Sequence, residues 1–107
     1  METRRVTRHT RAADARLVQV MNVLRVPARL RLLFALDEGE LSVTQLIRAT
    51  RLRQPSVSAN LRVLRDAKLV QRRRVANFAL YRSSDSTVMR ILLDLKQHLA
   101  QTGNTKK

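Results

Sequence analysis

The sequence contains no cysteine, only two glycines and two prolines, and very few aromatic residues. Without cysteine, disulfides, thiolate metal ligands and thiol redox sensing are excluded. The aromatic side chains are Phe34, Phe78 and Tyr81, so we expect an aliphatic core. No apolar run approaches the ~20 residues of a membrane span, and the basic N-terminus lacks the apolar stretch of a secretory signal. We therefore expect a cytoplasmic protein with no membrane partner.

Acidic residues are also scarce. Eight Asp and Glu residues stand against 22 Lys and Arg residues, which gives a formal net charge of +14 at pH 7. Self-repulsion of that size opposes a compact fold and is tolerable when the partner is a polyanion. The alternative is that the charge only keeps the surface solvated. Arginine predominates, and its planar guanidinium suits phosphates and guanine edges.

A chain of 107 residues has the usual size of one domain. We expect a basic flexible tail over 1–11, a folded domain over 12–101 and a polar tail over 102–107. Apolar spacing, together with residues that begin and end helices, predicts helices over 12–25, 27–38, 43–50, 55–67 and about 85–101. Between the last two, 69–75 and 78–82 resemble strands around a tight turn at Ala76-Asn77. The predicted fold is mainly α with a small β-hairpin, in the order α-α-α-α-β-β-α.

The third and fourth helices, joined by a turn at 51–53, match a helix-turn-helix, and the hairpin that follows makes it winged. In such a unit the second helix enters the major groove with its N-terminal residues toward the bases. Gln and Asn amides pair with adenine edges, and Ser bonds to bases or phosphates. The positions on that helix predicted to contact DNA are Gln54, Ser56, Ala59, Asn60 and Arg62.

Charge supports this placement, because no acid occurs between Leu41 and Arg65. Strand alternation points Arg72 and Arg74 to one face of the hairpin and Arg73 to the other. We expect the hairpin to reach flanking phosphates or the minor groove. The residues predicted to contact the DNA backbone, or to lie on the wing against it, are Ser42, Thr44, Arg51, Arg53, Arg65, Arg72, Arg73, Arg74 and Asn77.

The last predicted helix is apolar on most sides, which indicates burial on most sides. In so small a domain the extra face is expected to meet a second subunit, although a single-chain core helix is the alternative. The first helix has one apolar stripe, with residues at i, i+3, i+4 and i+7.

The segment Leu52–Val70, LRQPSVSANLRVLRDAKLV, resembles the recognition segment of the ArsR family of winged-helix regulators. The stretches 25–33 and 40–43 resemble that family's second-helix entry and its link into the third helix. The likeness covers about residues 15–99, and SSDSTVMRIL is similar to the cysteine-poor branch typified by nodulation and haemolysin regulators. The resemblance implies a homodimer paired through the first and last helices, and repression at a palindromic operator. It also implies that Ser58 lies on the DNA-facing helix, beside Gln54, Ser56 and Asn60. The interface residues would be Leu17, Val20, Met21, Leu24, Val88, Leu92, Leu95 and Leu99.

The chain departs from the family's pattern at three positions. Members usually have glycine at Arg51, a capping serine at Arg53 and histidine at Asn60. Loss of the glycine and of the cap costs about 1 kcal/mol each, and two arginines there suggest extra phosphate contacts.

Metal sensing is not expected. Many relatives bind metals through Cys-x-Val-Cys, but here Ser42-Val43-Thr44 offers no soft ligand. At a second family site on the last helix, Asp85 and His98 remain, whereas Thr87 and Gln101 are poor zinc ligands. We interpret Asp85 as a helix cap and His98 as an interface residue. No cofactor is expected, and no residue cluster identifies a small-molecule effector.

The sequence predicts a sequence-specific, double-stranded DNA-binding transcriptional regulator, a repressor that acts as a homodimer. An enzyme is not expected, because no Gly-rich phosphate loop or nucleophile–base pair is present. Two alternatives are a winged-helix RNA-binding module and a protein-interaction module without operator specificity. The scarcity of aromatics argues against single-strand recognition, and the arginines of 48–82 argue against a module that no longer binds DNA.

Overall fold

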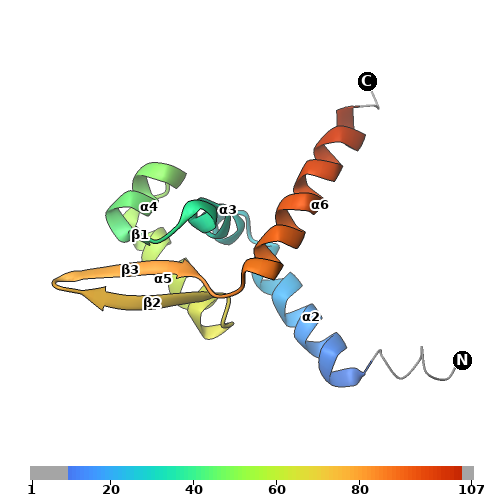
Figure 1. Ribbon diagram of the computed structural model, residues 1–107, viewed down its shortest axis with the longest axis horizontal. Coiled ribbons are helices and arrows are strands. Elements are labelled where there is room, and N and C mark those ends of the chain that lie inside the picture. Colours follow the sequence, from blue (N-terminus) through green and yellow to red (C-terminus); the bar gives the residue numbers. More distant parts are fainter. Residues whose placement is uncertain (1–9, 105–107) are drawn as a thin grey trace, which may run out of the picture.

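The computed structural model describes residues 10–104 and confirms the predicted order of elements (Figure 1). The tail predicted over 1–11 lies outside the described residues except at its last two positions. The elements are α2 (Arg11–Leu24), α3 (Pro27–Ala35), the 3-10 turn η1 (Leu36–Glu38), β1 (Leu41–Ser42), α4 (Val43–Thr50), α5 (Gln54–Asp66), β2 (Val70–Val75), β3 (Phe78–Ser83) and α6 (Ser86–Asn104). Helix α6 runs three residues past the predicted end, into the segment expected to be a tail.

Side chains at the helix starts explain several boundaries. Thr10 accepts a 3.1 Å hydrogen bond from the Ala13 amide and caps α2. Ser42 and Gln45 form a capping box at α4, in which each side chain bonds the backbone amide of the other residue. Asp85 caps α6, because its Oδ1 accepts from the Thr87 and Val88 amides at 2.8 and 3.2 Å. The predicted capping role of Asp85 is confirmed.

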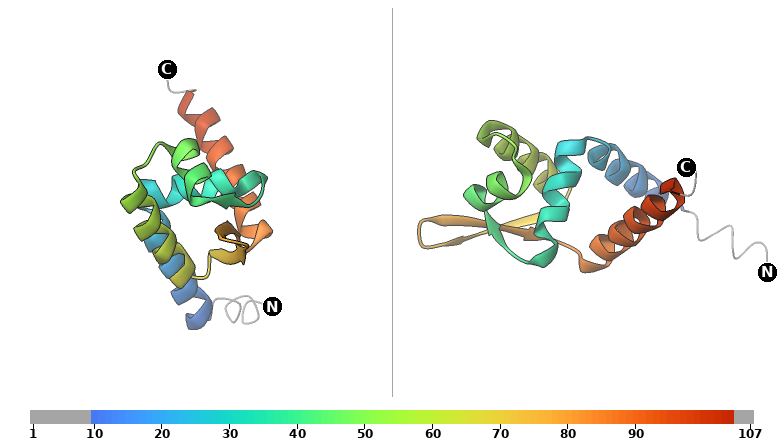
Figure 2. Two further views of the ribbon diagram at one scale, coloured as in Figure 1. Left: turned by 90° about the vertical axis from the view of Figure 1, so that its left-hand side faces the viewer. Right: turned by 90° about the horizontal axis from the view of Figure 1, so that it is seen from above.

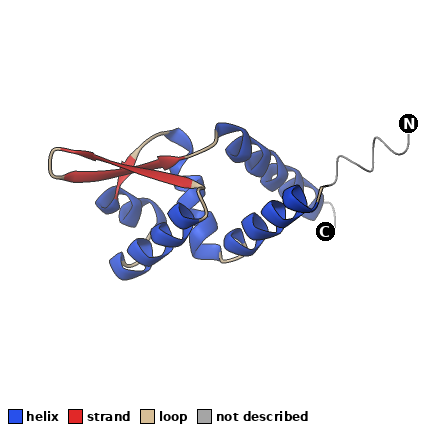
Figure 3. Cartoon of the chain, turned by 90° about the horizontal axis from the view of Figure 1, so that it is seen from below, coloured by secondary structure: helices blue, strands red, loops and turns tan. Residues whose placement is uncertain are grey.

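The strands form an antiparallel sheet in the order β1-β3-β2 (Figure 3). The hairpin is confirmed, with Val75 opposite Phe78 at its tip. The left-handed residue of its turn is Ala76, with φ 53°, rather than the expected neighbour Asn77. The short strand β1 was not predicted, and it pairs Leu41 with Tyr81 and Ser42 with Leu80. It ties the start of α4 to the wing.

The core is aliphatic, as expected, and lies where α3, α4 and α5 meet. Its fully buried side chains are Leu32, Leu33, Leu46, Val57, Leu61 and Leu64. Val70 and Tyr81 extend this core under the sheet, and Met89 anchors the start of α6. Helix α3 contacts α2, α4, α5 and α6, so it is the central element of the chain.

The outer helices α2 and α6 lie together on one side of the molecule, and α4, α5 and the wing lie on the other (Figure 2). The helix-turn-helix and the wing therefore form one side of the molecule, and the first and last helices form the other.

Candidate nucleic-acid interface

The turn between α4 and α5 determines how α5 is presented. Arg51 adopts the left-handed conformation, with φ 61° and ψ 21°, and its amide bonds the Ile47 carbonyl at 2.7 Å. Arg53 is the N-cap of α5 and makes no side-chain capping bond. A left-handed arginine is strained by roughly 1 kcal/mol relative to glycine, so the expected local cost at position 51 has a structural basis. Both side chains are exposed.

The face of α5 opposite the core is exposed and carries no acid over its first three turns. Buried Val57, Leu61 and Leu64 define the core side. Gln54, Ala59 and Arg62 are exposed, as the helical pattern predicted, and Ser58, which the family resemblance placed on this helix, is exposed as well. Arg65 is half-buried. This face offers an amide and a hydroxyl that donate and accept hydrogen bonds, a guanidinium that donates them, and a methyl group for apolar contact, which are the groups that read base edges.

Ser56 and Asn60 differ from the expectation that they are free of internal contacts. Both are half-buried, and Asn60 Nδ2 donates to the Ser56 carbonyl and hydroxyl at 2.9 and 3.2 Å. Asn60 Oδ1 accepts a 3.1 Å bond from Arg29 Nε of α3. The two residues lie one turn apart on the side of α5 that packs against α3. The Asn60 amide is thus already used inside the chain.

Arg29 extends this network to α2, because its Nη1 donates to the Val23 carbonyl at 3.3 Å. One guanidinium therefore joins the end of the first helix to the middle of α5. Sequence reasoning missed Arg29, because its partners lie six and 31 positions away in the chain.

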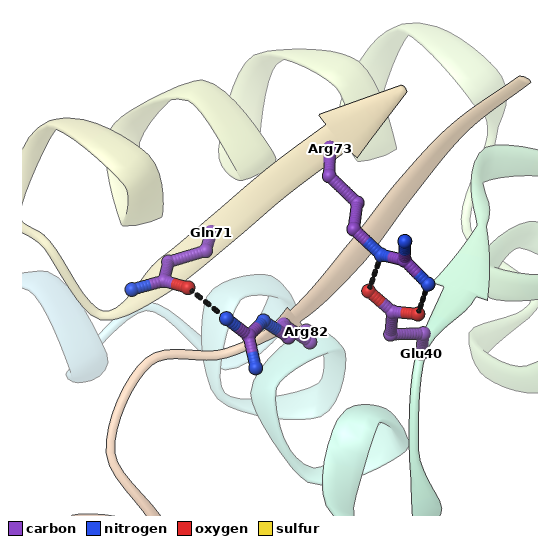
Figure 4. A network of polar contacts seen from close by, with 4 residues as sticks. All are labelled: Glu40, Gln71, Arg73 and Arg82. Atoms are coloured by element: carbon purple, nitrogen blue, oxygen red, sulfur yellow. Dashed lines mark hydrogen bonds and ion pairs between the residues drawn. The ribbon is translucent and has the colours of Figure 1, made fainter. Parts of the chain in front are cut away.

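The wing arginines alternate as expected: Arg72 pairs with Tyr81 and Arg74 with Ala79 on one face, while Arg73 lies opposite Leu80 on the other. Arg73 is not free, however. Its Nε and Nη2 each donate a 2.7 Å hydrogen bond to the carboxylate of Glu40 (Figure 4). On the same face Arg82 donates to Gln71 Oε1 at 2.7 Å. Within residues 10–104, Arg72 and Arg74 are exposed and form no ion pair.

The contact between Arg73 and Glu40 shifts the pKa of both groups. The hydrogen bonds from Arg73 lower the pKa of the Glu40 carboxyl, against a smaller opposing effect of burial, and the charges of Arg73 and Arg82 lower it further. The same contact raises the pKa of Arg73. The pair is therefore fully ionised at neutral pH.

The remaining predicted backbone contacts lie around α4 and the hairpin tip. Ser42 is half-buried and its hydroxyl accepts the Gln45 amide, so it serves first as a cap. Thr44, at the start of the same helix, and Asn77, in the hairpin turn, are exposed. Ser42 therefore caps α4, as the sequence allowed for either Ser42 or Thr44.

The predicted dimer face is apolar and largely open. Leu17, Met21, Leu95 and Leu99 are 49–61% exposed. Val20, Val88 and Leu92 are half-buried, whereas Leu24 is only 8% exposed and belongs to the chain's own core. Two further residues, Val18 and Ile91, add apolar surface that was not predicted. A hollow of about 770 Å³ lies between α2 and α6 on this side.

The described residues 10–104 include no group of three or more His, Cys, Asp or Glu side chains arranged to hold a metal ion. Asp85 caps α6, and His98 is exposed on that helix. In the same part of the chain, no helix combines the length and apolar character that a membrane crossing requires.

Residues 26–72 match the family profile described as "Bacterial regulatory protein, arsR family". The chain is 37% identical over 84 residues to the biofilm growth-associated repressor of Agrobacterium fabrum, covering 76% of this chain and 72% of the relative. It is 35% identical over 86 residues to a transcriptional repressor SmtB homolog of Synechocystis sp., covering 80% of this chain. The chain spans 65% of that relative's length, slightly under two thirds.

Solved structures are similar over most of the chain. The transcriptional repressor BigR from Xylella fastidiosa superposes with a TM-score of 0.76 at 30% identity, covering 87% of this chain and 93% of that one. The homodimeric winged helix-turn-helix DNA-binding domain Mb0332 from Mycobacterium bovis gives 0.75 at 30% identity, covering 90% and 88%. NolR from Sinorhizobium fredii gives 0.70 at 31% identity, covering 80% and 86%. The winged helix-turn-helix prediction is confirmed.

Proposed function

Because the chain belongs to the arsR family of bacterial regulatory proteins, we propose that it is a homodimeric transcriptional repressor that binds double-stranded DNA. This family consists of regulators rather than enzymes. The bacterial DNA that it would bind lies in the cytoplasm, which is its proposed site of action. The observation that carries the proposal is a pair of exposed features: the face of α5 with Gln54, Ser58 and Arg62, which carries no acid over its first three turns, and the wing arginines Arg72 and Arg74, which form no ion pair within the described residues.

Base reading is assigned to the exposed side of α5. Gln54, Ser58 and Ala59 lie in its N-terminal half, where a recognition helix meets base edges, and Arg62 lies one turn beyond Ser58. Gln is suited to adenine and Arg to guanine, while the Ala59 methyl suits the methyl group of thymine. Ser56 and Asn60 are assigned a supporting role, because their polar groups bond each other and Arg29.

Phosphate contacts are assigned to the exposed polar and basic side chains that surround this helix. They supply affinity and register rather than sequence preference. This set comprises Thr44, Arg51, Arg53, Arg65, Arg72, Arg74 and Asn77. Arg73 contributes less, since Glu40 already neutralises it.

A second copy of the chain is the proposed cover of the α2–α6 face. Five apolar side chains of this face are about half or more exposed: Leu17, Met21, Ile91, Leu95 and Leu99. A monomer rarely exposes so many apolar side chains on one face, because their contact with water is unfavourable. Two-fold pairing presents two α5 helices to an inverted repeat, with half-sites about one helical turn apart.

Selection from a random duplex library with the full chain tests this function, followed by fluorescence anisotropy on the recovered duplex. We expect one enriched inverted repeat, and affinity that falls by ~10³ or more between 50 and 200 mM salt if six or more phosphates are contacted. Gln54→Ala should change the preferred sequence, and Arg74→Ala should weaken all duplexes alike. Arg90→Ala, which removes an exposed arginine from α6, is the matched control. Equal binding of competing double-stranded RNA, or a salt-insensitive complex, would contradict the proposal.

A further inference from the structure

The tip of the wing is apolar. Val75 and Phe78 face each other as the last cross-strand pair of β2 and β3. Phe78 is 65% exposed and Val75 is 41% exposed. Of the three aromatic side chains in the chain, Tyr81 is buried and Phe34 is half-buried, so Phe78 alone presents its ring to solvent. The candidate interface described above does not use this ring.

The position of the tip prevents the chain from covering it. The hairpin projects beyond the helices, and its turn is the part of the wing farthest from α2 and α6 (Figure 1, Figure 3). The α2–α6 face lies at the other side of the molecule, so a two-fold partner seated there does not reach the tip. Any cover for Phe78 therefore comes from what the wing touches.

The positive charge around the tip favours a polyanion as the surface that covers Phe78. The segment 67–84 carries five basic residues and no acid. Arg72 and Arg74 are exposed on the strand that leads to the tip, and Arg73 is held by Glu40 on the other face. An apolar protein partner would have to accept this uncompensated charge. The minor groove of DNA accepts both features, because its potential attracts arginine and its sugar walls offer apolar surface, against which apolar side chains pack in minor-groove complexes.

We propose that Phe78, supported by Val75, packs into the minor groove beside the base pairs that α5 reads, and that it thereby selects A·T over G·C pairs at the flank. This inference rests on the proposed function and adds a specificity-determining residue to it. The amino group of guanine lies on the floor of the minor groove. Under an apolar ring both kinds of pair lose water from their groove acceptors, but a G·C pair also leaves this amino donor without an acceptor, which adds a cost that an A·T pair does not have.

Replacing the base pairs that flank the selected site tests the minor-groove contact separately from contacts in the major groove. An inosine·cytosine pair resembles G·C in the major groove but lacks the minor-groove amino group. Duplexes with A·T, I·C or G·C at the flank are compared by anisotropy at constant salt. The proteins are the wild type, Phe78→Ala, Phe78→Leu, and Gln71→Ala as an exposed control away from the tip.

The wild type and Gln71→Ala should bind the A·T and I·C duplexes alike and the G·C duplex about 10-fold more weakly, the size of effect that one base-pair mismatch produces. Phe78→Ala should weaken binding to the A·T duplex about 10-fold and remove the discrimination, while Phe78→Leu should retain most of both. The inference is overturned if Phe78→Ala binds and discriminates like the wild type, or if I·C behaves like G·C. Failure of the wild type to enrich any duplex overturns the proposed function itself, so the two failures are distinguishable.

Discussion

Arg73 donates two 2.7 Å hydrogen bonds to the carboxylate of Glu40, and these bonds join strand β2 to the residue in front of β1. The pair holds the wing against the start of α4, and therefore fixes the hairpin relative to the helix-turn-helix. Residues 72–74 form the most basic run of the chain. Arg73, in the middle, pairs with Glu40, whereas Arg72 and Arg74 on either side form no ion pair within the described residues. Functional predictions for the three residues differ accordingly.

The Glu40→Gln variant tests this contact through the pH dependence of the free energy of unfolding. Arg73 holds the pKa of Glu40 below its ordinary value, so the pair stabilises the fold above the ordinary Glu pKa near 4.5 and loses that effect as pH falls through the lowered value. Urea titrations should show the wild type more stable than Glu40→Gln at pH 7, with the difference shrinking toward pH 3. The effect should be small, because Arg73 is largely exposed. A difference that stays constant from pH 7 to pH 3 would mean that the carboxylate charge does not contribute.

Arg73→Ala and Arg74→Ala should separate in DNA binding. Arg74 is free to neutralise a phosphate, so its removal should reduce the slope of log affinity against log salt by about 1. Arg73 already has an internal counter-charge, so Arg73→Ala should change the slope by clearly less. Anisotropy titrations at four salt concentrations measure both slopes. Equal slopes for the two variants would show that Arg73 leaves Glu40 when DNA binds.

Much of this architecture was predictable from the sequence because it depends on local patterns. Apolar spacing, Pro27, Pro55 and the turn at Ala76-Asn77 act within a few residues of where they stand, so the order of elements follows from them. Contacts between distant segments were not predictable. The strand β1 exists because Leu41 and Ser42 pair with β3, about 40 positions later.

The candidate site shows the same division between local and distant effects. Helical periodicity identifies Gln54, Ala59 and Arg62 as exposed positions on α5, and the structure agrees. Periodicity does not show that α3 places a guanidinium beside Asn60, 31 positions away. Side chains with several hydrogen-bonding groups are therefore the ones whose roles a single sequence leaves open.

Asn60→Ala should affect stability and leave the preferred DNA sequence unchanged. Its amide links α5 to Arg29, and loss of a part-buried hydrogen bond to a charged group costs about 1–2 kcal/mol. A double-mutant cycle with Arg29→Ala should give a coupling energy of about 1 kcal/mol in urea unfolding. Gln54→Ala is the comparison, with a changed sequence preference and near-normal stability. If Asn60→Ala selects a new operator, the residue reads bases and the supporting role is wrong.

Met21→Glu and Leu95→Glu should separate the proposed dimer into folded monomers. Both side chains are about half or more exposed in the single chain, so a carboxylate there remains solvated in the monomer but is buried in the dimer. Sedimentation should show the monomer mass with unchanged helix content, and affinity for the inverted repeat should fall by about 100-fold or more. Gln97→Glu adds the same charge to an exposed polar position of α6 and should remain dimeric.

Arg51→Gly tests whether backbone strain at the helix-turn-helix serves binding. Arg51 has φ 61°, where glycine is unstrained, so the substitution should leave the free energy of unfolding unchanged or raise it by up to about 1 kcal/mol. If the guanidinium contacts a phosphate, the same change should lower affinity for every duplex and reduce the salt slope by about 1. Arg51→Asn is the control, because Asn tolerates the left-handed conformation and also removes the charge. The two variants should then match in DNA binding, since both lose the same contact. A glycine variant that binds DNA as tightly as the wild type would show that the Arg51 guanidinium makes no phosphate contact, so recognition would not explain the strained conformation at this turn.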